Sequence, residues 1–278
     1  MQIIIPIILV FLSMVSEPVQ ADWKQIAPGM DILYVTAKSK SIEVNSRITV
    51  VRIDPARWEL VFMGISQQGQ ESIRTAREWY ETNKLTAAIN AGMFAENYRT
   101  HVGYLRFRDY VNSAGINNYQ SILAFDPKKG KEIPPFRIFD LDASGITIKT
   151  ILEDYSSAIQ NLRLIKKPGI NVWKQQDRKW SEAAIGEDDK GRILFIFSRS
   201  PFSMYDLNRE LLEAGIGIVA AQHLEGGPEA QLYVKSGSFE IELSGSYETS
   251  YNEDDGNVIS WLIPNILGVR PRVKAANQ

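Results

Sequence analysis

Apolar runs separated by turn residues predict β-strands along most of the chain. Residues 47–53 and 58–63 are rich in β-branched and aromatic side chains, and the Asp-Pro-Ala-Arg between them predicts a turn, so we expect a hairpin. Residues 86–92, 193–198 and 216–221 are almost wholly apolar, which is typical of buried strands. Segment 193–198 is too hydrophobic for either face to be solvated, and we expect it at the centre of a sheet.

Two segments carry apolar residues at helical spacing. Residues 72–83 predict an amphipathic helix that begins behind Ser72 as its N-cap. Residues 203–214 predict a second helix, which ends at Gly215 and packs against the sheet. A final apolar stretch, 258–263, predicts a closing strand.

This order of elements predicts one α+β domain with a mixed β-sheet core flanked by a few helices. The chain contains no internal repeat, no Pro-rich linker and no abrupt change of composition, so nothing divides it further. We expect an N-terminal extension over residues 22–45, the domain over 46–272 and a short tail over 273–278.

The N-terminal residues indicate export. Residues 3–15 form an apolar run that is shorter than the roughly 20 residues of a membrane-spanning helix. Val19-Gln20-Ala21 places small residues at the −3 and −1 positions, which predicts a signal peptide over 1–21 and a secreted or periplasmic protein. No Lys or Arg precedes the run, so an uncleaved anchor is the alternative. No second long apolar stretch follows, and we expect no membrane span after cleavage.

Composition excludes several classes of function. The 278 residues include no cysteine, which removes disulfide scaffolds, thiolate zinc sites and thiol nucleophiles. A formal charge of −2 is unlike that of a dedicated nucleic-acid-binding protein, so we expect no nucleic-acid partner. The sequence also lacks the nucleophile elbow, the P-loop and the dinucleotide fingerprint. The two histidines have no zinc-site spacing.

Two turn motifs follow buried strands. In the first, Asn90 precedes Gly92, and the pattern fits either a structural Asx turn or a backbone that approaches a ligand closely. In the second, Glu225 and Glu229 flank Gly-Gly-Pro, which fits either a solvated surface turn or the rim of an active site. From the residues alone both interpretations stay open.

Together these motifs resemble the phosphodiester glycosidase domain family, whose members include a lysosomal glycosidase and secreted bacterial proteins. The resemblance rests on Asn90-Ala-Gly-Met-Phe, on Ala184-Ile-Gly186 and on Leu224-Glu-Gly-Gly-Pro-Glu-Ala, and it runs from about Ser46 to Arg270. It implies an enzyme that hydrolyses a glycosyl phosphodiester on an envelope or extracellular glycan.

The chain departs from the family pattern at three positions. Glu225 replaces a usual Asp, and Glu229 replaces a usual Ser. Glu182 stands in a segment where the family has an Arg, so the expected anion-binding cation is missing and Arg163 or Arg199 is the candidate to replace it. These changes fit an altered substrate or a loss of activity.

The chemistry of the bond suggests the role of each residue. A glycosyl phosphodiester breaks at C1 through an oxocarbenium-like transition state, so the site needs a carboxylate near C1 and donors for the phosphate. We expect Glu225 to stabilise that charge or to activate water, with Glu229 as second carboxylate or sugar contact and His223 as acid or phosphate ligand. The expected substrate-binding residues are Asn90, Gly92, Arg99, His101, Arg163, Arg199, Gly226 and Gly227.

Two other functions stay open. Aromatic residues near the motifs could stack on sugars in a noncatalytic carbohydrate-binding or envelope-binding protein. The acidic segment Asn252–Asn257 suggests a calcium-stabilised structural protein, although it lacks the spacing of a calcium loop. The glycosidase interpretation requires no cofactor, and a divalent cation that bridges Glu225 and phosphate is conceivable. The sequence gives no indication of oligomeric state.

Overall fold

The fold is built from antiparallel sheets. The computed structural model describes residues 21–38 and 46–273, and all strand pairs within these ranges are antiparallel. The largest sheet has eight strands in the order β1 (Lys24–Ala27), β2 (Met30–Thr36), β3 (Arg47–Ile53), β14 (Ile193–Phe202), β13 (Trp180–Asp188), β15 (Ile218–Gly226), β11 (Arg163–Lys166) and β12 (Ile170–Asn171).

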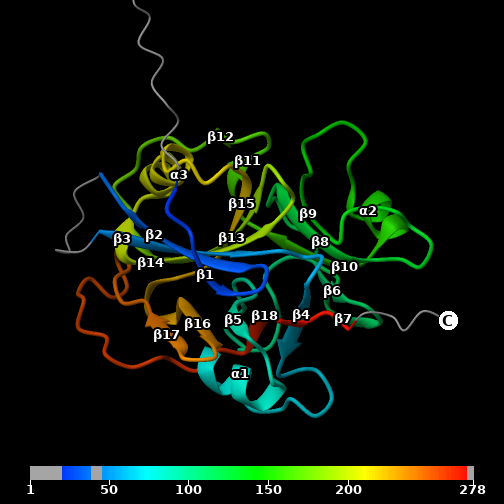
Figure 1. The fold of residues 1–278 in the computed structure, drawn as a ribbon, viewed down its shortest axis with the longest axis horizontal. Helices are drawn as coiled ribbons and strands as arrows, with labels where there is room; N and C mark the ends of the chain where they lie inside the picture. The colour runs from blue at the N-terminus through cyan, green and yellow to red at the C-terminus, as the bar shows by residue number, and fades with distance from the viewer. Residues whose placement is uncertain (1–20, 39–45, 274–278) are drawn as a thin grey trace, which may run out of the picture.

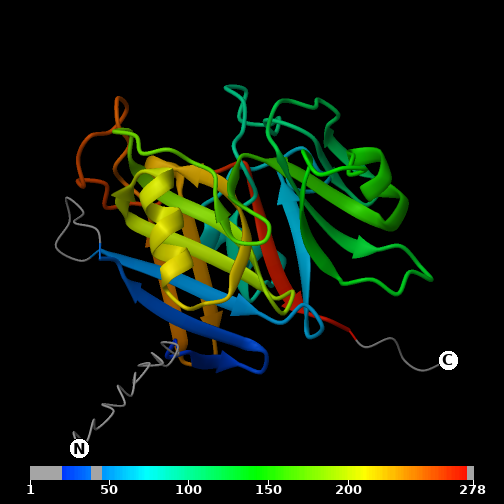
Figure 2. The same cartoon turned by 90° about the horizontal axis from the view of Figure 1, so that it is seen from above.

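Two five-stranded sheets complete the described part of the chain (Figures 1 and 2). One has the order β7 (Tyr110–Ser113), β6 (Leu105–Phe107), β10 (Tyr155–Asn161), β8 (Ser121–Pro127) and β9 (Phe136–Asp140). The other has the order β17 (Phe239–Ser244), β16 (Gln231–Ser236), β5 (Ala87–Asn90), β18 (Asn265–Pro271) and β4 (Trp58–Gly64). The last strand of the chain, β18, therefore lies inside its sheet.

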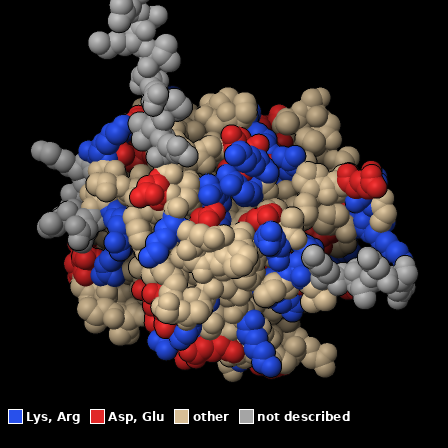
Figure 3. All heavy atoms as spheres, viewed as in Figure 1, with Lys and Arg blue, Asp and Glu red and all other residues tan. Residues whose placement is uncertain are grey.

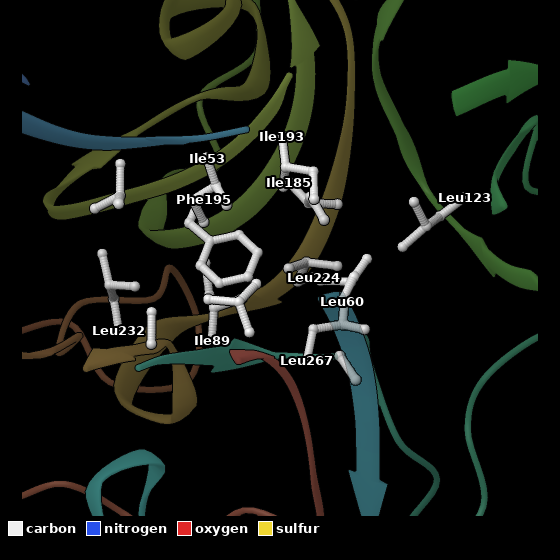
Figure 4. Packing of buried hydrophobic residues seen from close by; sticks show 14 of the residues in the cluster. Ile53, Leu60, Ile89, Leu123, Ile185, Ile193, Phe195, Leu224, Leu232 and Leu267 are labelled. Carbon is white, nitrogen blue, oxygen red and sulfur yellow. The ribbon is translucent and has the colours of Figure 1, made fainter. Parts of the chain in front are cut away.

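The main core lies where the three sheets face one another. We call the five-stranded sheet that contains β4 and β18 the β4–β18 sheet, and the one that contains β6 and β10 the β6–β10 sheet. Phe195 of the eight-stranded sheet packs in one cluster with Ile89 and Leu267 of the β4–β18 sheet and with Leu123 of the β6–β10 sheet (Figure 4). Strand β14 is buried on both faces, because Leu194 and Ile196 belong to a second cluster on its other side. This confirms the predicted buried, central strand.

Each helix covers the outer face of one sheet. Helix α3 (Met204–Glu213) packs on the eight-stranded sheet, α1 (Ala76–Asn83) on the β4–β18 sheet and α2 (Ile148–Asp154) on the β6–β10 sheet. The N-cap of α3 is Ser203, as the pattern predicts. Helix α1 begins later than predicted, because Thr75 and Glu78 form a capping box and take the place of Ser72.

The fold class is predicted in its broad outline only. With three α-helices in the described residues, the domain is dominated by sheet, and its sheets are antiparallel rather than mixed. Two predicted features are wrong. Strands β3 and β4 form no hairpin: the turn at Asp54 exists, but β3 pairs with β2 and β14 whereas β4 pairs with β18. The closing strand is β18, not 258–263, since Val258 is 91% exposed.

Strands β14 and β15 position the site. Both are antiparallel to β13, which lies between them, so they run parallel to each other with α3 as their connection. The end of β15 therefore lies beside the start of β13, with Ala183 opposite Glu225.

The predicted N-terminal segments lie only partly within the described residues. The predicted signal peptide lies almost wholly outside them, whereas β1 and β2 of the expected extension join the eight-stranded sheet. Among the described residues, no helix is long and apolar enough to cross a membrane. On the face shown in Figure 3, basic and acidic side chains are interspersed.

Candidate active site

A pocket of about 210 Å³ opens where β15 ends and β13 begins. Its walls come from six parts of the chain: β15, the start of β13 with the residues before it, the turn after β5, the link between β10 and β11, the first residue of α3 and the loop after β17. The lining residues are Met93, Leu162, Arg178, Trp180, Met204, His223, Glu225, Gly226 and Glu248. The lining thus combines apolar side chains with ionisable groups.

Glu225 is the most perturbed carboxyl group that lines this pocket. Burial raises its pKa to about 8, and the nearby carboxylates of Glu229 and Glu248 act in the same direction. The charge of His223 and the backbone N–H of Gly226, which donates to Glu225 Oε1 at 3.2 Å, oppose the shift. At neutral pH, Glu225 therefore carries its proton, which is the state required of a general acid.

His223 forms a buried pair with Glu182. Its Nδ1 lies 2.6 Å from Glu182 Oε1, and Trp180 Nε1 donates to Glu182 Oε2 at 2.6 Å. Burial alone would lower the pKa of His223, but the carboxyl groups of Glu182, Glu225 and Glu248 together outweigh that effect and the pKa is raised. The pair thus favours the imidazolium form of His223 beside Glu225.

Two further glutamates lie at the rim. Glu229 is half-buried and accepts a hydrogen bond from the Tyr98 hydroxyl at 3.1 Å, and burial raises its pKa. Burial also raises the pKa of Glu248, partly offset by His223 and Arg178. A Cβ on Gly227 would lie 2.5 Å from Glu248 Oε2, so only glycine allows this approach of backbone and carboxylate.

Arg178 supplies a cationic side chain to the pocket. It is exposed, and it lies close enough to Glu248 to lower the pKa of that carboxyl. Among residues 21–38 and 46–273, no group of three or more His, Asp or Glu side chains is arranged to hold a metal ion. The polar chemistry described for this pocket is that of carboxyl groups, one imidazole and one guanidinium.

A larger pocket, of about 810 Å³, lies at the other end of β13 and includes Arg52 and Arg192. Both cations are already paired, Arg52 with Asp31 at 2.7 Å and Arg192 with Asp188 at 2.6 Å. Since size alone does not make a reactive site, the smaller pocket with the perturbed carboxyl group is the candidate.

Comparison with known proteins decides the family. The family model for phosphodiester glycosidases matches residues 83–270, which include every strand that contributes to the pocket. The chain belongs to the phosphodiester glycosidase family.

Solved structures show the same fold at low sequence identity. The catalytic domain of zebrafish N-acetylglucosamine-1-phosphodiester alpha-N-acetylglucosaminidase, auto-inhibited by its pro-peptide, is 18% identical with a TM-score of 0.62, over 91% of this chain and 87% of that one. A hypothetical protein from Synechocystis is 15% identical with a TM-score of 0.60, over 88% of this chain and 62% of that one. No curated protein matches the chain significantly.

In this glycosidase-family chain, the second sequence motif supplies the pocket. His223, Glu225 and Gly226 line it, and Gly227 and Glu229 follow in the adjoining turn. Arg99 lies on an exposed turn of the segment that follows β5. No side-chain partner is recorded for Arg99 among the described residues.

Asn90 of the first motif binds the second motif. Its Nδ2 donates to the carbonyl oxygen of Glu229 at 2.9 Å, and its Oδ1 accepts from the backbone N–H of Gln231 at 2.7 Å. Both ends of the buried amide are thus used to fix the turn that carries Glu229. This geometry makes Asn90 a positioning residue.

Asn90→Ala is expected to lower the free energy of unfolding by about 2 kcal/mol, because it leaves a buried N–H and a buried carbonyl without partners. Urea denaturation measures the change. Asn118→Ala, on an exposed side chain, is the control and is expected to change stability by less than about 0.5 kcal/mol. Equal stability of the two variants would contradict the role of Asn90.

Gly92 and His101 lie together behind the pocket. A Cβ on Gly92, whose φ is +144°, would lie 2.3 Å from Asn161 Oδ1 and 2.4 Å from His101 Cε1. His101 is 2% exposed, its Nε2 is paired with the Gln160 carbonyl oxygen at 2.9 Å, and burial lowers its pKa to about 4. His101 is therefore neutral at physiological pH and enclosed by protein.

The two arginines expected to bind phosphate are engaged elsewhere. Arg163 makes a two-bond contact with Asp142, at 2.8 and 3.1 Å, and also pairs with Asp140 at 3.0 Å. Arg199 donates to the carbonyl oxygens of Ser244, Asp255 and Asn257 and pairs with the Asp255 carboxylate at 2.7 Å. Neither arginine lines the pocket around Glu225.

Sequence reasoning missed Arg178 and Glu248. They meet because the backbone of residues 247–249 pairs with residues 179–181, as in the hydrogen bond from Ser181 N to the Tyr247 carbonyl oxygen. No local pattern predicts this pairing, since both segments are polar and irregular. Arg178 thus supplies a cation near the position where the sequence indicates that one is missing.

Proposed function

We propose that the protein hydrolyses a glycosyl phosphodiester at the pocket around Glu225. The observation that carries the proposal is a buried carboxyl group with a pKa of about 8, in a pocket that the Arg178 guanidinium and the His223 imidazole also line, the pKa of the latter being raised. Family membership supports this class of reaction. Because the chain is only 18% identical to the zebrafish enzyme, we do not extend the sugar named for that enzyme to this chain.

The proton of Glu225 reduces the repulsion of an anionic substrate. A phosphodiester carries one negative charge and would be repelled by four ionised glutamates, Glu182, Glu225, Glu229 and Glu248. With Glu225 protonated three remain, and the phosphate oxygens meet the Arg178 guanidinium and a ring N–H of His223 as donors. The negative phosphate in turn opposes the ionisation of Glu225, so the bound substrate keeps the acid form in place.

This arrangement assigns the acid role to Glu225 in place of the charged carboxylate role that the sequence suggests. The Glu225 proton would pass to the phosphate oxygen that leaves C1. The carboxylates of Glu229 and Glu248 are then the groups that stabilise positive charge at C1 or accept a proton from water. Trp180, which lines the pocket, offers a ring face of the kind on which sugars pack.

The direct test is turnover of the purified protein on a panel of sugar-1-phosphodiesters and matched glycosides with neutral leaving groups. Release of free sugar from the diesters alone is the expected result. If neither set is hydrolysed while glycans bind, the protein is the noncatalytic carbohydrate-binding alternative. We further propose that the enzyme is secreted or periplasmic and acts on an envelope or extracellular glycan, which the pattern of residues 1–21 supports.

Arg178→Ala is expected to raise KM for the diester about tenfold, because a charge-assisted hydrogen bond to phosphate is lost at a partly solvated position. KM for any neutral glycoside that is cleaved should stay unchanged. Lys190→Ala, a cation at the larger pocket, is the matched control. A fall in diester turnover through kcat alone would contradict a binding role for Arg178.

A further inference from the structure

Glu182 is buried, and both of its carboxylate oxygens are used. It is 1% exposed, with Oε1 2.6 Å from His223 Nδ1 and Oε2 2.6 Å from Trp180 Nε1. A buried carboxylate costs free energy unless each oxygen has a donor. The His223 Nδ1–H and the indole N–H supply these donors, so the side chain is fixed from two sides.

The same contacts fix His223. Its backbone N–H donates to the Leu162 carbonyl oxygen at 2.9 Å, and its ring lies at 75° to the Trp180 ring with 6.2 Å between centroids. Nδ1 is committed to Glu182. Since His223 lines the pocket, Nε2 is the ring nitrogen left to meet a substrate.

We propose that Glu182 is a positioning residue that keeps His223 doubly protonated, with its Nε2–H presented to the phosphate of the substrate. This inference rests on the proposed function and adds to it that anion recognition depends on a titratable cation. A histidine imidazole, unlike an arginine guanidinium, changes its charge within the physiological pH range.

The charged groups that face His223 come from three elements. Glu182 lies on β13, Glu225 on β15 and Glu248 on the loop after β17, and each favours the imidazolium when it is ionised, which for Glu225 is the case only above its pKa of about 8. Glu182 is the one in direct contact. Arg178 lines the same pocket and acts on Glu248. Removal of the Glu182 charge should therefore release the proton of His223 at a lower pH, with the other two carboxyl groups in place.

The pH dependence follows from the sign of this shift. Below the raised pKa of His223 the imidazolium donates to phosphate, and above it the donor is a neutral ring with a weaker hold on the anion. We expect KM for a diester to rise with pH through this range. For a neutral glycoside we expect no such rise.

Histidine titration by nitrogen-15 NMR tests the inference without any need for turnover. The chain has two histidines, and His101 is neutral, so the untagged protein gives a readily assigned pair of signals. We expect His223 to be doubly protonated at pH 7. In Glu182→Gln its midpoint should fall by at least about one pH unit, which is a tenfold change in proton affinity.

Two further variants separate charge from packing. Trp180→Phe removes the indole donor and keeps the carboxylate, so the midpoint of His223 is expected to stay above its ordinary value. Glu132→Gln, on an exposed loop, should leave it unchanged. A wild-type midpoint at or below the ordinary value, or an unchanged midpoint in Glu182→Gln, would overturn the inference.

Dimethyl phosphate serves as the anionic probe. It is expected to shift the His223 signals of the wild type at pH 7, and to shift those of Glu182→Gln much less at the same pH. If the titrations behave as expected but no diester is hydrolysed, the proposed reaction fails and the role of Glu182 stands. If diesters are hydrolysed and the dimethyl phosphate shift is absent, anion recognition by His223 is wrong.

Discussion

Glu225→Gln should lower kcat for a glycosyl phosphodiester about a thousandfold, because a positioned general acid contributes 10²- to 10⁴-fold to a rate. Glutamine has nearly the same shape and keeps an oxygen to accept the Gly226 N–H, which Glu225 Oε1 accepts at 3.2 Å. It has no comparable proton to give. Steady-state kinetics on a reactive diester measures the loss, with Glu132→Gln as the surface control.

The same variant should not be less stable than the wild type at pH 8 and above. The pKa of Glu225 is raised from 4.5 to about 8 in the folded protein, so between these values the folded state binds more protons than the unfolded state. The free energy of unfolding of the wild type therefore falls as pH rises through this window, and glutamine does not titrate. Loss of activity together with lower stability at pH 8 would indicate misfolding rather than loss of the acid.

The second large effect is expected for Gly245→Ala, at about 3 kcal/mol of lost stability, which is the upper end of the range for overpacking. A Cβ at this position would lie 2.1 Å from the carbonyl oxygen of Gly227 and 2.8 Å from Ser181 Cβ. These atoms belong to the backbone of the turn after β15 and to β13, so neither neighbour can yield by rotating a side chain.

Urea denaturation of Gly245→Ala measures this loss through the shift of the midpoint at constant m-value. Gly115→Ala is a matched control, because its φ also lies outside the left-handed region and the nearest atom to its Cβ would be 3.6 Å away. We expect that control to lie within about 0.5 kcal/mol of the wild type. Equal midpoints for the two variants would show that the turn after β15 can move freely.

Elements that depend on local sequence are predicted well. The apolar run of β14, the short strand β5 and the Ser203 cap of α3 each contain their own signal, and the structure confirms all three. Pairing between strands contains no such signal. The turn at Asp54 is real, yet the two strands beside it join different sheets: β3 pairs with β2 and β14, whereas β4 pairs with β18.

The residues of the candidate site also divide into those that a local sequence pattern indicates and those that it does not. Glu225 and His223 could be singled out because they end an apolar strand, in a Gly-rich motif. Arg178 and Glu248 could not, since they enter the pocket through backbone pairing between polar segments about 70 residues apart, as between Lys179 and Thr249. The pairing of Arg163 with Asp140 and Asp142 could not be predicted either. These acidic residues lie 23 and 21 positions away in the sequence, and no local pattern indicates that they contact Arg163.

The position of β18 inside its sheet has a consequence for synthesis. Until residues 265–271 are available, β4 and β5 lack the strand that lies between them, and β5, which ends at Asn90, has β16 as its one neighbour in this sheet. Completion of this sheet, and with it the full support of the Asn90 amide that holds the turn of Glu229, therefore waits for residues 265–271.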